Sequence, residues 1–233
     1  MKGQWLLLLD GHHPSRFNMQ RDLDLFDAVR KGHIPGFLRI YNWDIPAVTV
    51  GHHGSQFRFH DPSLEIPIIK RPTGGGAVLH IDDITYSISA ASGNVFGSTI
   101  METYSLISDV FVRAFRRLGL DAMKSQGDTR FSEVCFARSG PMEITLYGKK
   151  VMGSAQLRKD GYFLQQGVIP LKTDRDLAAR VFGPGYGEWI GSIRDTVKDF
   201  DEKAFIAYLI DGFSNITGTT MPVFSDKAGH IYL

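Results

Sequence analysis

The chain of 233 residues contains a single cysteine, Cys135, and this scarcity limits the chemistry available to the protein. One cysteine cannot form an intramolecular disulfide or build a cysteine-rich zinc site. A lone cysteine in an apolar neighbourhood is most often a small core residue and less often a nucleophile. Both roles stay open for Cys135, because the segment Val134-Cys135-Phe136-Ala137 is apolar and has no histidine close in sequence.

An excess of charge and a long hydrophobic segment are also missing. Lys and Arg number 26 against 25 Asp and Glu, giving a net charge of +1. Without a field of one sign we expect no nucleic-acid partner. The apolar run Trp5–Leu9 stops at Asp10 and is too short for a membrane span or a signal-peptide core. We therefore expect a cytoplasmic protein that does not associate with membranes.

Histidine pairs occur twice, but neither pair has metal-ligand geometry. Adjacent residues of an extended strand point to opposite faces, so His12-His13 and His52-His53 cannot chelate an ion as they stand. We predict no metal site.

What the chain does have is the composition of a globular protein. Hydrophobic residues make up 43% of the sequence and charged residues 22%, which argues against disorder. The length suits one large core, and no repeat, low-complexity segment or linker divides it. We predict a single domain over residues 1–233, in which Phe182–Gly191 is a glycine-rich loop.

Short segments rich in β-branched and aromatic residues dominate the first two thirds of the chain and predict strands. They are Trp5–Leu9, Phe37–Tyr41, Ala47–Val50, Ile66–Lys70, Ala77–His80, Ile84–Ser89, Met142–Tyr147, Lys150–Ala155 and Tyr162–Ile169. Apolar residues at three- and four-residue spacing predict helices over 18–32, capped by Asn18, over 103–118, and over 202–217, capped by Asp201. In the first helix we expect the inward residues to be Met19, Leu23, Phe26 and Val29. In the second we expect Ile107, Phe111 and Phe115 in the core, with Arg113, Arg116 and Arg117 off the apolar face. Strands and helices do not alternate as βαβ units, so we predict a mixed α/β (α+β) fold with a large, mostly antiparallel sheet flanked by helices.

The strongest local pattern is Arg71-Pro72-Thr73-Gly74-Gly75-Gly76-Ala77-Val78-Leu79-His80, between two predicted strands. A phosphate loop or a dinucleotide fingerprint needs a helix directly after its glycines, and here a strand follows. Three glycines instead allow the main chain to lie against a thin ligand, with Arg71 near for an anionic oxygen. The alternative is a tight hairpin without a ligand.

A second pattern is Tyr147-Gly148-Lys149-Lys150-Val151-Met152-Gly153-Ser154-Ala155-Gln156. Gly148 fits a hairpin turn, and Lys150 then lies further into the following strand than Lys149. We predict that Lys150 points into a pocket and that Lys149 stays solvated.

Together these segments resemble the lipoate and biotin cofactor-transferase family, whose members include lipoate-protein ligase A. Arg39-Ile40-Tyr41-Asn42-Trp43, with Pro46 and Gly51, is similar to the family's early strand pair. The segment Lys70–His80, called the glycine hairpin below, and Thr85-Tyr86-Ser87 look like the family's acyl-binding hairpin. Residues 148–156 with Gln165-Gln166-Gly167 look like the strand of its characteristic lysine, Lys150. The resemblance implies a class II biotin/lipoate ligase-like fold. The substrate-binding residues it implies are Arg71, Thr73, Gly74, Gly75, Gly76, Ala77, His80, Gly153, Ser154, Ala155 and Gly167.

The family contains two chemistries. Ligases activate lipoate with ATP, and transferases take an octanoyl group from acyl carrier protein through an acyl-cysteine. Ligases commonly carry Arg-Asn-Asp before the lysine strand, where this chain has Gly140-Pro141-Met142-Glu143-Ile144. Transferases that modify the glycine cleavage H protein have a Cys-Phe segment followed by a strand with glutamate, which Cys135-Phe136 and Glu143 resemble. We also expect little room for an accessory domain before Leu233, although some ligases keep that domain on a separate chain.

The resemblance therefore implies an octanoyltransferase in which Cys135 is the nucleophile and Lys150 stabilises the oxyanion. Its partners would be octanoyl-acyl carrier protein and a lipoyl-carrier protein, either the glycine cleavage H protein or an E2 lipoyl domain, and it would need no cofactor. One alternative is an ATP-dependent lipoate-protein ligase without the accessory domain, which needs ATP and Mg and leaves Cys135 inert. Another is a non-catalytic binder of acyl carrier protein or of a lipoyl domain.

Overall fold

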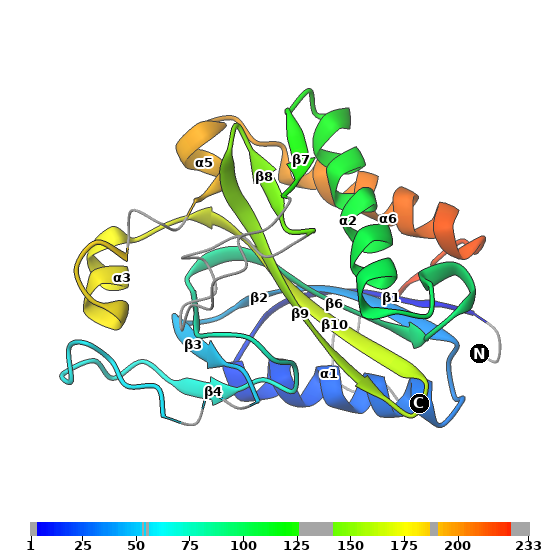
Figure 1. The fold of residues 1–233 in the computed structure, drawn as a ribbon, viewed down its shortest axis with the longest axis horizontal. Helices are drawn as coiled ribbons and strands as arrows, with labels where there is room; N and C mark the ends of the chain where they lie inside the picture. The colour runs from blue at the N-terminus through cyan, green and yellow to red at the C-terminus, as the bar shows by residue number, and fades with distance from the viewer. Residues whose placement is uncertain (1–3, 53, 55, 126–141, 187–190, 225–233) are drawn as a thin grey trace.

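The computed structural model describes residues 4–52, 54, 56–125, 142–186 and 191–224 (Figure 1). The candidate nucleophile Cys135 lies in the segment 126–141, outside the described residues. All nine predicted strands are observed, with ends displaced by a few residues.

An eight-stranded sheet forms the centre of the described structure, in the order β11-β1-β2-β6-β10-β9-β8-β7. Its strands are β11 (Val223–Phe224), β1 (Leu6–His13), β2 (Gly36–Trp43), β6 (Asp82–Ala91), β10 (Tyr162–Lys172), β9 (Lys149–Lys159), β8 (Ile144–Leu146) and β7 (Ala122–Lys124). Strand β1 runs parallel to β11 and β2, and the other neighbouring pairs are antiparallel. The predicted large, mixed and mostly antiparallel sheet is confirmed.

A second, three-stranded sheet lies beside the first (Figure 1). Strand β3 (Ala47–Val50) is its centre, paired in parallel with β4 (Ile68–Lys70) and antiparallel with β5 (Val78–His80). Residues 71–77 connect β4 to β5 across the end of β3, because β3 lies between these two strands. The predicted hairpin is therefore wrong in its pairing: the segment is a loop that crosses β3, and the name glycine hairpin is kept for it below.

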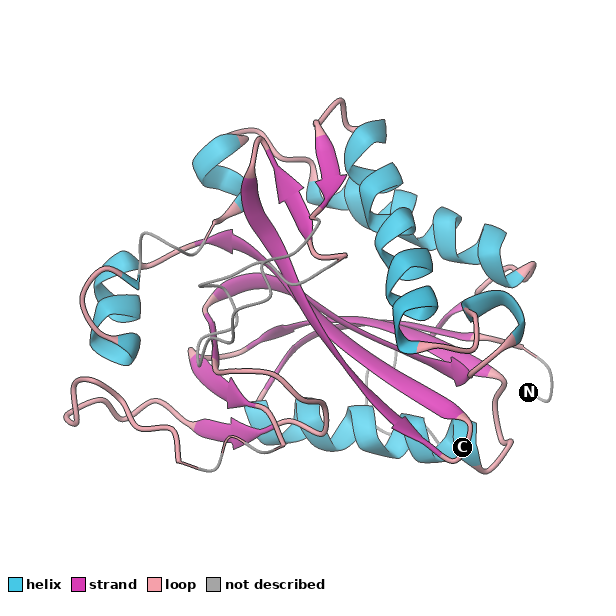
Figure 2. Cartoon of the chain, in the orientation of Figure 1, coloured by secondary structure: helices cyan, strands magenta, loops and turns pink. Residues whose placement is uncertain are grey.

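Helices cover both faces of the large sheet (Figure 2). Helix α1 (Ser15–Arg30) packs on one face and α2 (Ile100–Arg117) with α6 (Glu202–Thr217) on the other. Strand β1 reflects this sandwich, because Leu6 and Leu8 join the α1 core while Leu7 joins the α2 core. Smaller helices complete the fold: η1 (Asn94–Phe96), α3 (Arg175–Phe182) and α5 (Ile193–Thr196).

The ends of α2 and α6 follow from side-chain caps. Thr99 and Glu102 form a reciprocal capping box at the start of α2. Asp201 accepts a hydrogen bond from the Ala204 amide at the start of α6, and Gly218 ends that helix with a φ of 64°. The predicted cap at Asp201 is confirmed.

The prediction for α1 was wrong in two details. The helix begins at Ser15 behind Pro14, and Asn18 is a buried helical residue that donates to the carbonyls of His13 and Asn42. Leu23, expected to face inward, has 37% of its surface exposed. No side chain caps the helix at Pro14, and Asn18, one turn further on, uses its amide for tertiary contacts instead.

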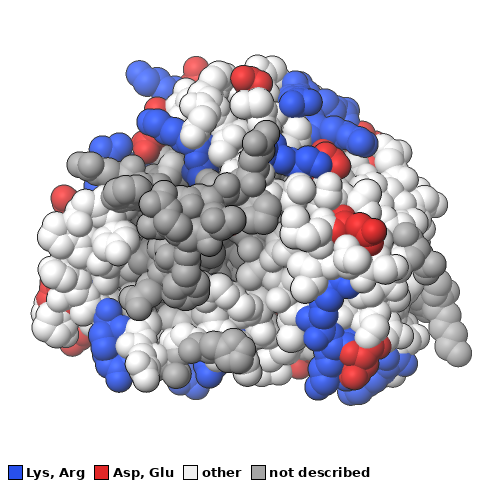
Figure 3. All heavy atoms as spheres, in the orientation of Figure 1, with Lys and Arg blue, Asp and Glu red and all other residues white. Residues whose placement is uncertain are grey.

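The distribution of charged side chains on the surface agrees with the balanced net charge. Basic and acidic side chains are interspersed on the face shown in Figure 3, without an extended field of one sign. Within the described residues, no helix combines the length and apolar character that a membrane crossing needs. The same residues contain no group of three or more His, Cys, Asp or Glu side chains able to hold a metal ion.

Candidate active site

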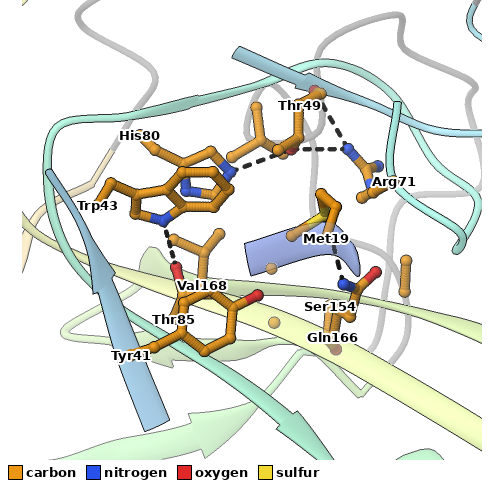
Figure 4. Close-up of a pocket in the computed structure, with 14 residues that line it drawn as sticks. Met19, Tyr41, Trp43, Thr49, Arg71, His80, Thr85, Ser154, Gln166 and Val168 are labelled. Carbon is orange, nitrogen blue, oxygen red and sulfur yellow. Dashed lines mark hydrogen bonds between the residues drawn. The ribbon is translucent and has the colours of Figure 1, made fainter. Parts of the chain in front are cut away.

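A cavity open to solvent lies between the two sheets, near the start of α1, where the glycine hairpin meets the large sheet (Figure 4). Its lining comes from both sheets and from α1. The lining residues are Met19, Tyr41, Trp43, Thr49, Arg71, Val78, His80, Thr85, Gly153, Ser154, Ala155, Gln166, Gly167 and Val168. Most of the exposed lining is apolar, and a few polar groups converge on it, which is the usual character of a small-molecule site.

A buried carboxylate fixes the wall of the cavity beneath α1. Asp22 of α1 is fully buried and accepts hydrogen bonds from Arg39, Tyr41, Ser87 and Gln166 at 2.6–2.9 Å. Arg39 is also fully buried and bridges Asp22 to Asp10. Because a buried charge is tolerated only when it is paired and hydrogen-bonded, this network holds Tyr41 and Gln166 in single orientations.

Tyr41 takes part in this network as a neutral donor. Burial, together with the nearby Asp22 carboxylate, raises the pKa of the Tyr41 hydroxyl well above its usual value. The hydroxyl therefore keeps its proton and donates a hydrogen bond to Asp22 at 2.9 Å, while the Tyr41 side chain also lines the cavity.

The opposite wall is built on Asp83. His80 Nδ1 lies 3.0 Å from one Asp83 carboxylate oxygen, and the Thr85 hydroxyl donates to the other at 2.6 Å. The ring of Trp43 stacks on His80 with centroids 4.1 Å apart and donates from Nε1 to Thr85. These bonds present a flat aromatic surface to the cavity, visible on one side of Figure 4.

Close backbone contacts hold the glycine hairpin on β3. A Cβ atom on Gly51 would lie 2.1 Å from the carbonyl oxygen of Gly75, so only glycine fits at Gly51. Gly75 itself has a φ of 89°, which side chains rarely adopt. The amide of His52 donates to the carbonyl of Thr73 at 3.0 Å. The hairpin is therefore seated against β3 with glycine at both contact points.

The lysine strand follows a hairpin turn at Tyr147 and Gly148, whose φ angles are 49° and 77°. Two positive values in succession are typical of a type I′ turn. Beyond it Lys149 is exposed, as predicted, and Lys150 is buried. Lys150 is not among the residues that line the cavity, so the pocket predicted for its side chain stays a prediction. Lys150 Nζ lies 2.8 Å from Glu143 Oε2, with side chains 4% and 12% exposed.

Another glycine in the site is required by an aromatic ring. A Cβ atom on Gly167 of β10 would lie 2.2 Å from Cε1 of Tyr86. Tyr86 is fully buried, and its hydroxyl accepts a hydrogen bond from Gln165 at 2.7 Å. Glycine at this position thus lets the ring pass directly behind the cavity wall.

The structure brings part of the predicted site together around the cavity. Arg71, His80, Gly153, Ser154, Ala155 and Gly167 line it. The lining does not include Thr73, Gly74, Gly75, Gly76 and Ala77. The Thr73 hydroxyl nevertheless donates a hydrogen bond to Gln166, and Gln166 does line the cavity. Lys150 is the second residue of β9, the strand that supplies Gly153–Ala155. Cys135, the remaining predicted site residue, lies outside the described residues.

Sequence reasoning did not identify Met19, Tyr41, Trp43, Thr49 and Gln166 as parts of the site. The helical spacing of Met19 is that of a core residue. Tyr41 and Trp43 belong to a strand buried on both faces, so alternation of polar and apolar residues gave no signal. The polar Thr49 and Gln166, buried within strands, were the signal available, because buried polar residues need specific partners.

Comparison with known proteins gives one consistent result. The family model for the lipoyl protein ligase A/B catalytic domain matches residues 14–214. The chain is 36% identical to octanoyltransferase LipM of Kyrpidia tusciae, over 73% of this chain and 67% of that protein. It is 34% identical to octanoyltransferase LipM of an Exiguobacterium species, over 90% of this chain and 87% of that protein.

Solved structures of similar fold belong to the same group. A putative lipoate protein ligase from T. acidophilum with bound lipoic acid superposes with a TM-score of 0.77, at 24% identity, covering 98% of this chain and 91% of that chain. At this identity the likeness shows the fold alone. The expected lipoate ligase-like catalytic fold is confirmed.

Proposed function

The chain belongs to the lipoyl protein ligase A/B catalytic domain family, and from that membership we propose how it acts. Relatives 32–36% identical over most of the chain are octanoyltransferases, and this chain is an octanoyltransferase of lipoate biosynthesis that acts on lipoyl-carrier proteins. The proposal concerns the residues, the donor and the acceptor. The observation that carries it is the largely apolar cavity between the glycine hairpin and the lysine strand, which suits an alkyl chain.

In the first step the Cys135 thiolate attacks the thioester carbonyl of octanoyl-acyl carrier protein. A carbon–sulfur bond to Cys135 forms, the carbon–sulfur bond to the carrier breaks, and the carrier leaves as a thiol with the proton that Cys135 gave up on forming the thiolate. In the second step the amine of an acceptor lysine attacks the new thioester, an amide forms, and the Cys135 thiol is released. Because the acyl group arrives as an activated thioester, the transfer needs neither ATP nor metal.

Lys150 is the residue we propose for stabilising the oxyanion in both steps. An ammonium donor aimed at the developing charge contributes most where water is excluded, and Lys150 is buried. Glu143, 2.8 Å away, fixes the position of the ammonium group through a charge-assisted hydrogen bond. The pair therefore supports a preorganised donor at the start of the strand that lines the cavity.

The proposed donor is octanoyl-acyl carrier protein and the proposed acceptor is the glycine cleavage H protein. The support is the Cys-Phe segment at Cys135 and the glutamate before the lysine strand, which resemble transferases of that specificity.

The experiment is a transfer assay with separate donors and acceptors. The protein is mixed with octanoyl-acyl carrier protein and H protein without nucleotide, and the acceptor mass is followed. A parallel arm supplies lipoate with MgATP, and another replaces H protein with an E2 lipoyl domain. We expect addition of one octanoyl group to H protein in the first arm and a lower rate with the E2 domain. Modification only in the ATP arm would overturn the transferase, and a faster E2 domain would overturn the acceptor.

A further inference from the structure

Arg71 stands in the cavity wall, and its guanidinium is bonded throughout to oxygens of its own chain. A guanidinium carries five N–H donors. Nε and Nη2 both donate to the Gly74 carbonyl, at 3.1 and 2.6 Å, and Nη2 also donates to the Gly76 carbonyl at 2.8 Å. Nη1 donates to the Thr49 carbonyl and to the Thr49 hydroxyl, both at 3.2 Å. These bonds use all five donors.

This arrangement differs from that of an arginine that binds an anion. Such an arginine presents two parallel N–H groups to a carboxylate or phosphate. In Arg71 the matching pair, Nε and Nη2, already converges on the Gly74 carbonyl, and only 6% of the residue's surface is exposed. A substrate anion would have to displace these bonds and leave main-chain carbonyls unpaired in the protein interior.

The bonds hold the hairpin at the point where its backbone is most unusual. The two hairpin carbonyls that Arg71 binds, those of Gly74 and Gly76, flank Gly75, whose φ is 89°. On the other side the Gly75 carbonyl packs against Gly51, where no Cβ would fit. The hairpin is thus fixed from both sides, by Arg71 through its carbonyls and by β3 through close packing.

The bonds between Arg71 and the hairpin, called the clamp below, continue through Thr49 to the cavity wall formed by Trp43 and His80. Arg71 can only donate, so the Thr49 hydroxyl accepts from it, and the same hydroxyl lies 3.0 Å from His80 Nε2. On the other side of the ring His80 Nδ1 lies 3.0 Å from the Asp83 carboxylate. The glycine hairpin and the Trp43–His80 wall therefore share one hydrogen-bond chain, seen in part in Figure 4.

We propose that Arg71 is a positioning residue that shapes the glycine hairpin for acyl transfer, and that it does not bind an anionic group of the substrate. This differs from the anion-binding role that the sequence allows for Arg71. The inference rests on the proposed function in one respect, because octanoyl transfer is one of its two readouts.

The test compares Arg71→Lys with Lys70→Ala. Lysine keeps the charge and binds phosphate well as a point charge, but it has no planar set of donors for the hairpin. We expect Arg71→Lys to lower the transfer rate at saturating donor by at least about tenfold and to speed hydrogen exchange of the hairpin amides by a similar factor. Lys70, exposed on β4, is the matched control, and Lys70→Ala should change both by less than about twofold.

Two further variants keep the proposal testable if Arg71→Lys does not fold. Thr49→Val removes one acceptor from Arg71 and should raise hairpin exchange and slow transfer, whereas Thr49→Ser should restore both. An Arg71→Lys protein with wild-type hairpin exchange and most of its maximal rate would overturn the clamp in favour of an anion ligand. If wild-type protein transfers no octanoyl group, the proposed function fails, while hydrogen exchange still tests the clamp.

Discussion

Lys150 Nζ lies 2.8 Å from Glu143 Oε2, and both side chains are largely shielded from water. We expect Lys150→Ala to lower acyl transfer by about 10²–10³-fold, the usual loss for an oxyanion donor. Lys149→Ala should leave the rate within about twofold, because Lys149 is exposed. Single-turnover transfer assays measure both, and equal losses from the two variants would contradict the assignment of Lys150.

A double variant separates catalysis from stability at this pair. Breaking a buried ion pair by removing one partner costs on the order of 3 kcal/mol, whereas replacing both partners with apolar residues is often neutral. Lys150→Met with Glu143→Leu should therefore regain most of the unfolding free energy that Lys150→Met alone loses, and remain inactive. Recovery of activity along with stability would make the lysine structural.

The glycine hairpin provides a second test. Gly75→Val should abolish transfer in a protein that still folds, because a β-branched residue is strained at a φ of 89° by at least about 1–2 kcal/mol. Gly74→Ala is the control, since no described atom lies within 4 Å of the Cβ it would add. Thermal unfolding and the transfer rate are the measurements. Wild-type turnover by Gly75→Val with an unchanged melting temperature would reduce the hairpin to a simple turn.

Met19 provides a test of chain-length selection. Its side chain lines the cavity between Arg71 and Gln166 in Figure 4, with Sδ 3.6 Å from Gln166 Nε2. Met19→Ala removes Cγ, Sδ and Cε, which leaves room for about two methylenes worth ~0.8 kcal/mol each. The ratio of decanoyl to octanoyl transfer should rise by about tenfold. As the control, Leu23→Ala on the exposed face of the same helix should leave the ratio unchanged. An unchanged ratio in Met19→Ala as well would mean that the end of the acyl chain does not lie against Met19.

Asp61 provides a pH-dependent prediction. Hydrogen bonds from Ser63 and from Arg180, the latter at 2.8 Å, lower the pKa of Asp61 from 3.8 to about 2. A folded pKa below the unfolded value means that the carboxylate stabilises the fold above about pH 4 and loses that contribution as the pH falls toward 2. Between pH 5 and pH 2 the denaturation midpoint of Asp61→Asn should therefore fall less than that of the wild type. Parallel curves would show that Asp61 is not coupled to folding.

Helices with strong periodicity could be predicted from the sequence, and irregular features could not. In α2 the apolar spacing correctly placed Ile107, Phe111 and Phe115 in the core and the three arginines outside it. The two- and three-residue strands β11 and β7 were missed, because pairing with β1 and β8 creates them and no local period marks them.

In the site, too, features with a local sequence pattern could be predicted and features that depend on distant residues could not. Lys150 could be predicted because its hairpin turn is local. Arg39 could not, since a fully buried arginine in a strand is explained only by Asp10 and Asp22, which come from β1 and α1. The bonds of Arg71 to its own hairpin were hidden for a related reason, because the sequence gives the residue but not the direction of its donors.

The most direct test is the intact mass of the protein after incubation with octanoyl-acyl carrier protein in the absence of nucleotide. We predict a gain of one octanoyl group in a hydroxylamine-sensitive linkage. Cys135→Ala should lose both the adduct and all transfer, and Cys135→Ser should be nearly as poor because an alcohol has a far higher pKa than a thiol. A Cys135→Ala protein that remains active and requires ATP and free lipoate would contradict transfer through an acyl-cysteine.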